Sequence, residues 1–280
     1  YAGKIIQQLG LHDEYTLYMV ASVQEEDCDG LCWQYIVNED GIRPEVVVIT
    51  EPTNLGVYRG HRGRMEIGVT TRGVSCHASA PERGDNAIYK MTPIIREIEA
   101  LNARLREDDF VGKGTNAVTY IECDPPSFNA VPPRCYIHLD RRLSRGETKE
   151  VAVHEVEEAV RRAGVEAKVH VPRYAQPSHT GLVYETEKYF PTWVLEEDHV
   201  AVRSAVRTYE ALFDKTPRVD KWVFSTNAVS ITGMFGIPSV GFGPGNEVFA
   251  HTVHEQMPVK QLIQAAAFYA TFAKQYVHMK

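Results

Sequence analysis

Three short runs of consecutive apolar, largely β-branched residues constrain the fold of this chain most. They cover residues 16–23, 45–50 and 237–243 and alternate with helical patterns. Near-continuous apolarity of this length is typical of strands that are covered on both faces, as in a parallel sheet between helices. Flanking helices are expected at residues 30–40, at residues 198–214 and after Pro258. The sequence therefore predicts an α/β fold with a mostly parallel sheet flanked by helices.

The middle of the chain has a different pattern. Residues 58–73 alternate polar and apolar side chains, which is the period of a half-exposed strand. Helix-like and strand-like stretches follow in the order helix, strand, strand, helix, strand, at residues 84–107, 116–123, 133–143, 147–163 and 166–172. The resulting order β-α-β-β-α-β is that of a ferredoxin-like α+β unit. We therefore predict an inserted domain at residues 58–172 that interrupts an α/β domain formed by residues 1–57 and 173–280.

The charge and the cysteine content exclude several classes of partner. The chain has 30 Lys and Arg against 37 Asp and Glu, a net charge of -7, and no basic patch. Nucleic acids and anionic membrane surfaces both favour clustered Lys and Arg, and no apolar stretch approaches the roughly 20 residues that span a bilayer. Five cysteines without small-scaffold spacing suit a reducing compartment. We expect a soluble, cytoplasmic protein that binds neither nucleic acid nor membrane.

Acidic and polar side chains follow each of the three predicted strands. Glu25 and Glu26 follow the first strand, Glu51 follows the second, and His251 lies in the loop after the third. Ligands bind beyond the carboxyl ends of strands in open α/β sheets, so these side chains are expected to converge. Each also has an ordinary interpretation: an acidic surface turn for the Glu pair, a strand-end carboxylate for Glu51 and a surface or capping histidine for His251.

Adjacent carboxylates can divide the work of a metal-dependent hydrolase. In extended backbone Glu25 and Glu26 point in opposite directions, so they can serve two different atoms. One can bind a cation while the other takes a proton from water held by that cation. The cation also removes the repulsion between the two charges, and a set of Glu and His ligands suits zinc, with manganese or cobalt as alternatives. The residues therefore predict a divalent-metal site.

Six sequence motifs occur in the order found in a known hydrolase family. They extend over essentially the whole chain and read SVQEEDCDG, ITEPTN, RGVSCHASAPERGDNAI, FNAVPP, LDRRL and GPGNEVFAHTVHE. In these motifs the chain resembles the co-catalytic zinc aminoacylase and carboxypeptidase family, which includes acetylornithine deacetylase, succinyl-diaminopimelate desuccinylase and glutamate carboxypeptidase. The resemblance implies a zinc-exopeptidase-like catalytic domain, an inserted dimerisation domain that forms a homodimer, and two divalent metal ions.

The resemblance also implies roles for individual residues of the catalytic domain. Glu25 matches the general base, and Glu26 matches the carboxylate ligand of one metal. Glu51 matches the carboxylate ligand of the second metal, and His251 matches the imidazole ligand of the first.

In the inserted domain the resemblance implies three substrate-binding residues. His77 matches the histidine that reaches across a dimer to the partner's active site and helps to hold the oxyanion or the substrate carboxylate. Asn129 and Arg142 match further substrate-binding positions. This chemistry is reasonable, because Arg holds a carboxylate through two parallel hydrogen bonds and a donating His stabilises charge on a carbonyl oxygen.

Two features depart from the family pattern. The family has a His-x-Asp histidine and a bridging aspartate before the base, and residues 1–24 match neither, since His12 and Asp13 do not fit. The chain is therefore expected to begin inside the helix that follows the bridging Asp and to lack two metal ligands. The second departure is FSTNAVSITG, where many members have a Gly-rich stretch with an Asp. Asn227 is expected at this substrate-binding position, with altered recognition.

Several other residues have a possible role that their spacing does not favour. Cys28 and Cys32 could hold zinc, but no second Cys or His pair follows at the spacing of a structural site. Cys76 beside a histidine is expected to be a packing residue, because neighbours in a strand diverge. His254 is expected to have a supporting or surface role, and Arg141 to point to solvent or to an ion pair.

These observations lead to two main hypotheses and a weaker third. The first is a metal-dependent hydrolase that cleaves an amide bond of a small, carboxylate-bearing N-acyl amino acid or dipeptide-like substrate, with Glu25 moving the proton from water to the leaving nitrogen. The alternative is a truncated, non-catalytic dimeric module without two metal ligands. A mononuclear site of Glu26 and His251 is the third. Family analogy supports only a reaction class, so the acyl group stays open.

Overall fold

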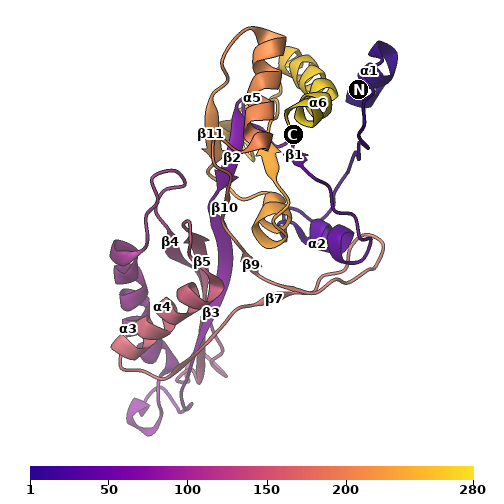
Figure 1. The fold of residues 1–280 in the computed structure, drawn as a ribbon. Coiled ribbons are helices and arrows are strands. Elements are labelled where there is room, and N and C mark those ends of the chain that lie inside the picture. Colours follow the sequence, from indigo (N-terminus) through magenta and orange to yellow (C-terminus); the bar gives the residue numbers. More distant parts are fainter. The chain divides into compact units, whose positions relative to one another are not determined.

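The computed structural model describes residues 1–280, which form two compact units (Figure 1). The first unit consists of Tyr1–His61 and Trp193–Lys280, and the second of Arg62–Thr192. The predicted inserted domain, 58–172, thus begins a few residues before the second unit begins. It ends well before the end of that unit at Thr192. No helix in either unit is long and apolar enough to cross a lipid bilayer.

The sheet of the first unit has the strand order β1-β12-β2-β10, and β11 also pairs with β2. β1 and β12 are parallel, with Val47 opposite Ser239, as expected for two of the three apolar runs. β2 is antiparallel to β12 and β10 and parallel to β11, so both directions occur in this sheet. The strands are β1 (Val47–Ile49), β2 (Val57–His61), β10 (Trp193–Val194), β11 (Val219–Trp222) and β12 (Ser239–Gly241).

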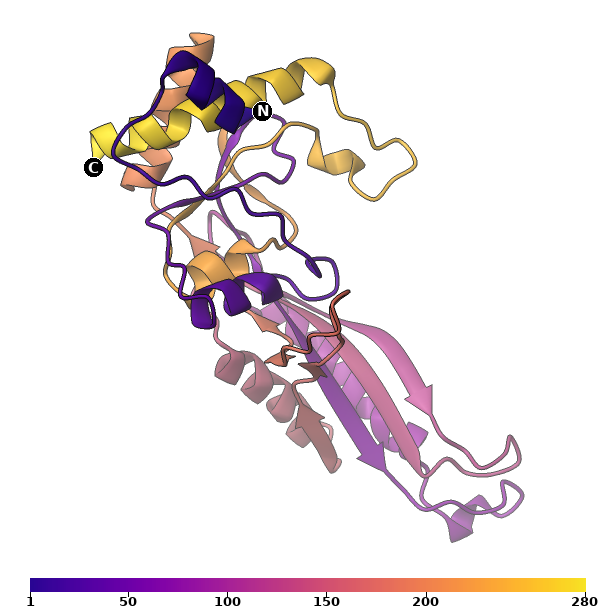
Figure 2. The ribbon, with the colours of Figure 1, turned by 90° about the vertical axis from the view of Figure 1, so that its right-hand side faces the viewer.

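Helices cover both faces of this sheet. The helices of this unit are α1 (Ala2–Leu9), α2 (Leu31–Asn38), α5 (Val200–Phe213), α6 (Val259–Met279), a π-helix at Val229–Met234 and a 3-10 helix at Glu247–Phe249. α5 and α6 lie side by side (Figure 2) and share a core with Val57, whereas Tyr58 belongs to the core that contains α2 and the π-helix. Successive strand residues point to opposite faces, so the two cores lie on opposite sides. The helices predicted at 30–40, at 198–214 and after Pro258 are confirmed.

The first apolar run is not a strand, which contradicts the prediction for residues 16–23. These residues have no regular structure and are exposed, and 71% of the surface of Met19 is accessible. A strand requires a neighbour that pairs with its backbone N–H and C=O groups. β1 has β12 on one side and no strand on the other, so no strand pairs with residues 16–23. Apolar composition alone did not predict this lack of a partner.

The second unit is the predicted ferredoxin-like α+β unit. Its sheet has the order β4-β5-β3-β6 with all neighbours antiparallel, which is the arrangement expected from the element order β-α-β-β-α-β. Met65, Ile67 and Val69 alternate along β3 and are fully buried against the helices. The elements are β3 (Gly63–Arg72), α3 (Ala87–Leu101), β4 (Thr115–Cys123), β5 (Arg134–Leu143), α4 (Lys149–Arg162) and β6 (Ala167–His170), with 3-10 helices at Pro81–Arg83 and Asn102–Arg104.

The segment after residue 172 belongs to the second unit because it pairs with that unit's own strands. β9 adds to the sheet beside β3, with Tyr189 opposite Met65 and Phe190 opposite Arg64. Phe190 is fully buried there. Three short strands lie in this segment, β7 (Arg173–Tyr174), β8 (Thr186–Glu187) and β9 (Tyr189–Phe190).

Two features of β5 lie inside the second unit. Arg141 is fully buried and its guanidinium donates to Glu147 at 2.6 Å and to Glu155 at 2.9 Å, so the ion pair expected as one alternative for Arg141 is confirmed. Cys135 lies opposite Cys123 of β4 with 3.4 Å between the two sulfur atoms, and both thiols are free.

Candidate metal centre

Glu25 and Glu26 lie in a tight turn, residues 22–30, which we call the acidic turn. Gln24 has the left-handed φ of 59°, and Cys28 N donates to the Gln24 carbonyl at 3.2 Å. The backbone at Glu25 and Glu26 therefore forms a turn and is not extended as expected. Residues 28–30 are buried, Glu25 is partly buried and Glu26 is exposed. The turn is thus fixed at its C-terminal end and displays Glu26 at the surface.

Two of the three predicted metal ligands, Glu26 and His251, contact each other, and the third, Glu51, interacts with the charges of both. His251 Nε2 lies 3.7 Å from Glu26 Oε2. Burial raises the pKa of Glu51, the charge of Glu26 raises it further, and the charge of His251 lowers it. Glu51 is therefore close enough to both residues to interact with their charges. A cation near these groups would stabilise the ionised carboxylates.

The donor chemistry of this group fits zinc, but the described residues supply only part of a ligand shell. Glu26, Glu51 and His251 offer carboxylate oxygens and an imidazole nitrogen, which are zinc ligands. No three His, Cys, Asp or Glu side chains converge tightly enough to hold a metal on their own. The side chains of Glu26 and His251 are about three quarters exposed, at 76% and 77%, so both are free to reorient around an ion.

The loop that carries Glu51 is fastened to the loop after β12. The hydroxyl of the buried Thr53 accepts from Gly243 N at 3.0 Å and donates to the Gly56 carbonyl at 2.8 Å. A Cβ on Gly243 would lie 2.1 Å from the Glu51 carbonyl oxygen, so only glycine allows this close approach.

Gly243→Ala is therefore expected to destabilise the protein by about 1–3 kcal/mol, the usual cost of overpacking a tight site. Urea unfolding measures this change. The matched control is Gly3→Ala in α1, where a Cβ meets only the Met19 sulfur at 3.4 Å, and no loss is expected there. Equal unfolding midpoints for the two variants would contradict the prediction.

The backbone at His251 is held in a conformation that L-residues seldom adopt. His251 has φ 59°, and its N–H donates to the Glu255 carboxylate at 3.0 Å. Sequence reasoning did not single out Glu255. Its position four residues after the predicted ligand, at the end of the same motif, is the signal that could have identified it.

Asn227 uses its side chain on the acidic turn. Its Oδ1 accepts from Gly30 N at 2.9 Å, and its Nδ2 donates to Ser22 Oγ at 3.1 Å. Asp29, which sequence reasoning also missed, accepts a hydrogen bond from Ser225. The neighbourhood of Asn227, predicted to bind substrate, is thus in contact with the turn that carries the predicted base.

His77 and Asn129, the substrate-binding residues predicted in the second unit, lie side by side at one end of its sheet. The N–H of Ala78 donates to the Asn129 carbonyl at 2.7 Å, and His77 forms a β-bridge with Ala130. The His77 ring is exposed, and its Nδ1 accepts from Ser79 N at 3.1 Å. Its Nε2 is therefore the ring nitrogen that can face a ligand.

Arg142, the third predicted residue of this unit, lies at the other end of the sheet. The register pairs Arg142 with Arg64 at the start of β3, whereas the loop with His77 follows Arg72 at its end. Eight residues of strand span roughly 26 Å. The Arg142 guanidinium already holds Asp140, at 2.8 and 3.1 Å. The residues His77 and Arg142 of one chain therefore cannot contact one small molecule.

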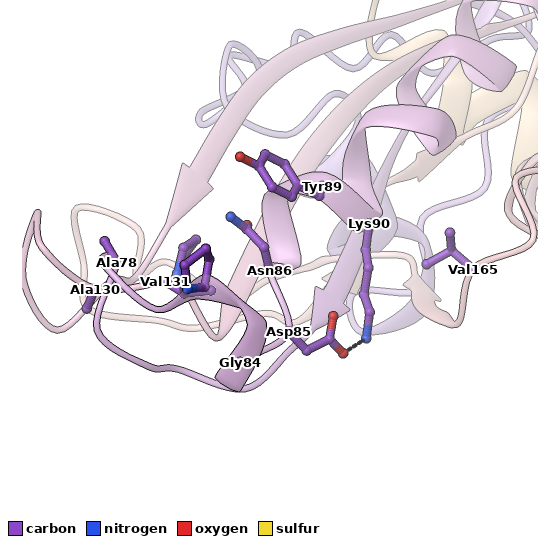
Figure 3. Close-up of a pocket in the computed structure, with 11 residues that line it drawn as sticks. Ala78, Gly84, Asp85, Asn86, Tyr89, Lys90, Ala130, Val131 and Val165 are labelled. Carbon is purple, nitrogen blue, oxygen red and sulfur yellow. Dashed lines mark hydrogen bonds and ion pairs between the residues drawn. The ribbon is translucent and has the colours of Figure 1, made fainter.

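A pocket of about 580 Å³ lies between α3 and the loops that carry Ala78 and Ala130 (Figure 3). Ala78 and Ala130, which follow His77 and Asn129 in the sequence, line it. Its one cationic side chain, Lys90, is paired with Asp85 and also donates to the Arg72 carbonyl at 3.0 Å. The pocket therefore offers no uncompensated charge to an anionic ligand.

The chain is similar to proteins of one family over almost its whole length. Residues 59–168 match the family model M20_dimer, described as the peptidase dimerisation domain. The chain is 57% identical over 272 residues to the Escherichia coli (strain K12) protein described as "Uncharacterized protein YgeY", a match that covers 96% of this chain and 67% of that protein. It is 26% identical over 267 residues to succinyl-diaminopimelate desuccinylase of Corynebacterium glutamicum, with 91% and 64% covered.

A solved structure shares the fold. The aminopeptidase PepT from Bacillus cereus superposes with a TM-score of 0.72 at 22% identity, covering 99% of this chain and 68% of that one. The chain spans about two thirds of the length of these relatives. It belongs to the M20 family of metallopeptidases and related amide hydrolases, the aminoacylase and carboxypeptidase family that its motifs resemble.

Proposed function

We propose that this protein is a metal-dependent hydrolase that removes an acyl or aminoacyl group from a small substrate with a carboxylate, such as an N-acyl amino acid or a dipeptide. The observation that carries the proposal is the 3.7 Å contact between Glu26 and His251, with Glu51 close enough to interact with both charges. Relatives named succinyl-diaminopimelate desuccinylase and acetylornithine deacetylase support a deacylase reaction.

The residues of the centre divide the chemistry among them. Glu26, Glu51 and His251 would hold divalent metal, two ions per site, with zinc favoured over cobalt or manganese for these donors. When bound, the metal supplies a Lewis acid and lowers the pKa of its water. Glu25 accepts the proton of the attacking water and passes it to the leaving nitrogen. Asn129 and Arg142 would bind the substrate, and His77 would donate to the oxyanion.

We propose a homodimer formed through the second unit, as the description of the matching family model suggests. β4 is the edge strand of its sheet and exposes Tyr120 by 53% and Ile121 by 51%, and such edges are templates for pairing with another chain. The separation of His77 from Arg142 supports this assembly, because a dimer can bring His77 of one copy and Arg142 of the other to one substrate. The same two residues of a single chain cannot reach one substrate.

We also propose a cytoplasmic location, which the five free cysteines fit.

His251→Ala, in the natural full-length protein that carries this sequence, is expected to weaken zinc binding by at least roughly tenfold, because even partners outside the ligand shell contribute that much. Competition with a chromophoric chelator measures the affinity. The control is His254→Ala, the other histidine of the same loop, which should bind zinc like the parent. Parent-like affinity in His251→Ala would remove this residue from the centre.

The reaction class is tested by incubating the same protein with N-acyl amino acids and dipeptides in the presence of zinc, cobalt or manganese. Hydrolysis of one class with two metals per chain supports the proposal. Metal binding without hydrolysis of any of these compounds favours the non-catalytic dimeric module, and one metal per chain with hydrolysis favours the mononuclear site.

A further inference from the structure

We propose that Asn227 is a positioning residue that closes the acidic turn and so holds Glu25 in place, instead of binding substrate. The inference rests on the proposed role of Glu25 as the general base. It identifies a residue on which that role depends, in a segment that is distant in sequence from the turn.

One side chain joins the two ends of the turn. Asn227 Oδ1 accepts from Gly30 N at 2.9 Å, and Asn227 Nδ2 donates to Ser22 Oγ at 3.1 Å. Ser22 and Gly30 are the first and last residues of the acidic turn. The side-chain carbonyl of Asn227 thus bonds to the turn, and so does one of the two N–H groups of its side-chain amide.

The support beneath Asn227 is rigid. Its backbone carbonyl accepts from Ser230 N at 3.1 Å at the start of the π-helix, whose residues Val229, Ser230 and Ile231 are buried. Gly30 is buried against the same element with φ 70°, and a Cβ there would lie 2.3 Å from Ser230 Oγ. The close approach of Gly30 and its backbone hydrogen bond to Asn227 therefore fix the end of the turn against a packed helix.

A fixed turn matters for a general base. Its carboxylate must lie within hydrogen-bond reach of the water it deprotonates, and a misplacement of about 1 Å can cost roughly a hundredfold in rate. Glu26 in the same turn contacts His251, so one movement of the turn would shift the base and a metal ligand together.

Hydrogen exchange tests the contact without metal or substrate. Asn227→Ala is expected to speed exchange of the Gly30 amide by about tenfold, the effect of losing one ordinary hydrogen bond. Asn227→Asp should restore protection, because the carboxylate accepts from Gly30 and the Ser22 hydroxyl can turn to donate. The control is Asn102→Ala in the second unit, which loses one donated and one accepted bond to the Asn116 backbone at 2.7 and 2.8 Å and a longer donated bond to the Glu99 carbonyl at 3.4 Å. It should leave Gly30 exchange unchanged.

Kinetics of the natural full-length protein separate positioning from substrate binding. Asn227→Ala should lower kcat by about ten- to a hundredfold with KM changed by less than about twofold, and Asn227→Asp should recover most of kcat. Unchanged Gly30 exchange in Asn227→Ala would overturn the proposal, as would a raised KM at unchanged kcat. Full activity in Glu25→Gln would instead reject the proposed function, while the exchange result would still stand.

Discussion

Replacing Glu25 by glutamine is expected to lower amide hydrolysis by about a hundred- to ten-thousandfold, the contribution of a positioned general base. Glutamine keeps the size and the carbonyl oxygen of the side chain but cannot take up a proton at neutral pH. Metal content should stay near that of the parent, because the predicted ligands are Glu26, Glu51 and His251. Steady-state kinetics with added zinc and elemental analysis of the purified variant measure the two quantities.

The control is Asp27→Asn, which removes the same charge from the acidic turn without touching the predicted base. Its activity should stay within a small factor of the parent. Substantial activity in Glu25→Gln would show that another group takes the proton. Loss of metal together with activity would place Glu25 among the ligands instead.

Arg141→Ala is expected to destabilise the second unit by about 3–5 kcal/mol, the cost of breaking a buried ion pair by removing one partner. Arg141 is fully buried between Glu147 and Glu155, at 2.6 and 2.9 Å, and alanine leaves two carboxylates facing each other. Urea unfolding followed by circular dichroism measures the change. Arg162→Ala is the control, because this exposed arginine lies 4.0 Å from Glu158 and such pairs contribute at most about 1 kcal/mol. Similar losses in the two variants would contradict the prediction.

The stability of the Arg141→Ala variant should depend on pH in a defined direction. Burial raises the pKa of Glu155, the charge of Arg141 lowers it, and the charge of Glu147 raises it, so removing Arg141 raises it further. A carboxyl whose folded pKa lies above its unfolded value favours the folded state at low pH, and this contribution is lost as the pH rises through the folded pKa. Arg141→Ala should therefore recover part of its lost stability as the pH falls toward about 4.3, the ordinary value for Glu.

The second unit could be predicted almost completely from its sequence because its pattern is local. Met65, Ile67 and Val69 alternate with polar residues, which identifies β3 and the face it buries. The order of helices and strands then leaves one common arrangement. The short strands β7, β8 and β9 carry no such pattern: β9 pairs with β3, and β7 and β8 pair only with each other.

The first apolar run shows the opposite case. Residues 16–23 have the composition of a buried strand, yet Met19 is exposed and no strand pairs with the segment. Strand formation requires a partner backbone as well as apolar side chains, and composition describes only the second requirement.

The candidate site was predictable where strand ends determine it and not where single contacts do. The neighbouring positions of Glu51 and His251 were expected, because these residues follow the parallel strands β1 and β12. No strand precedes Glu26, so its contact with His251 was expected for the wrong reason. The hydrogen bond between Asn227 and Gly30 joins positions 197 residues apart. No periodic pattern in the sequence predicts such a contact. The separation of His77 from Arg142 likewise depends on the register between β3 and β5.

The neighbouring thiols on β4 and β5 have a consequence for the chemistry of this sheet. Burial, with a smaller contribution from Cys123, raises the pKa of Cys135 to about 12. Burial therefore disfavours the reactive thiolate of Cys135 at neutral pH. Alkylation of the buried Cys135 is therefore expected to report the transient opening of the sheet.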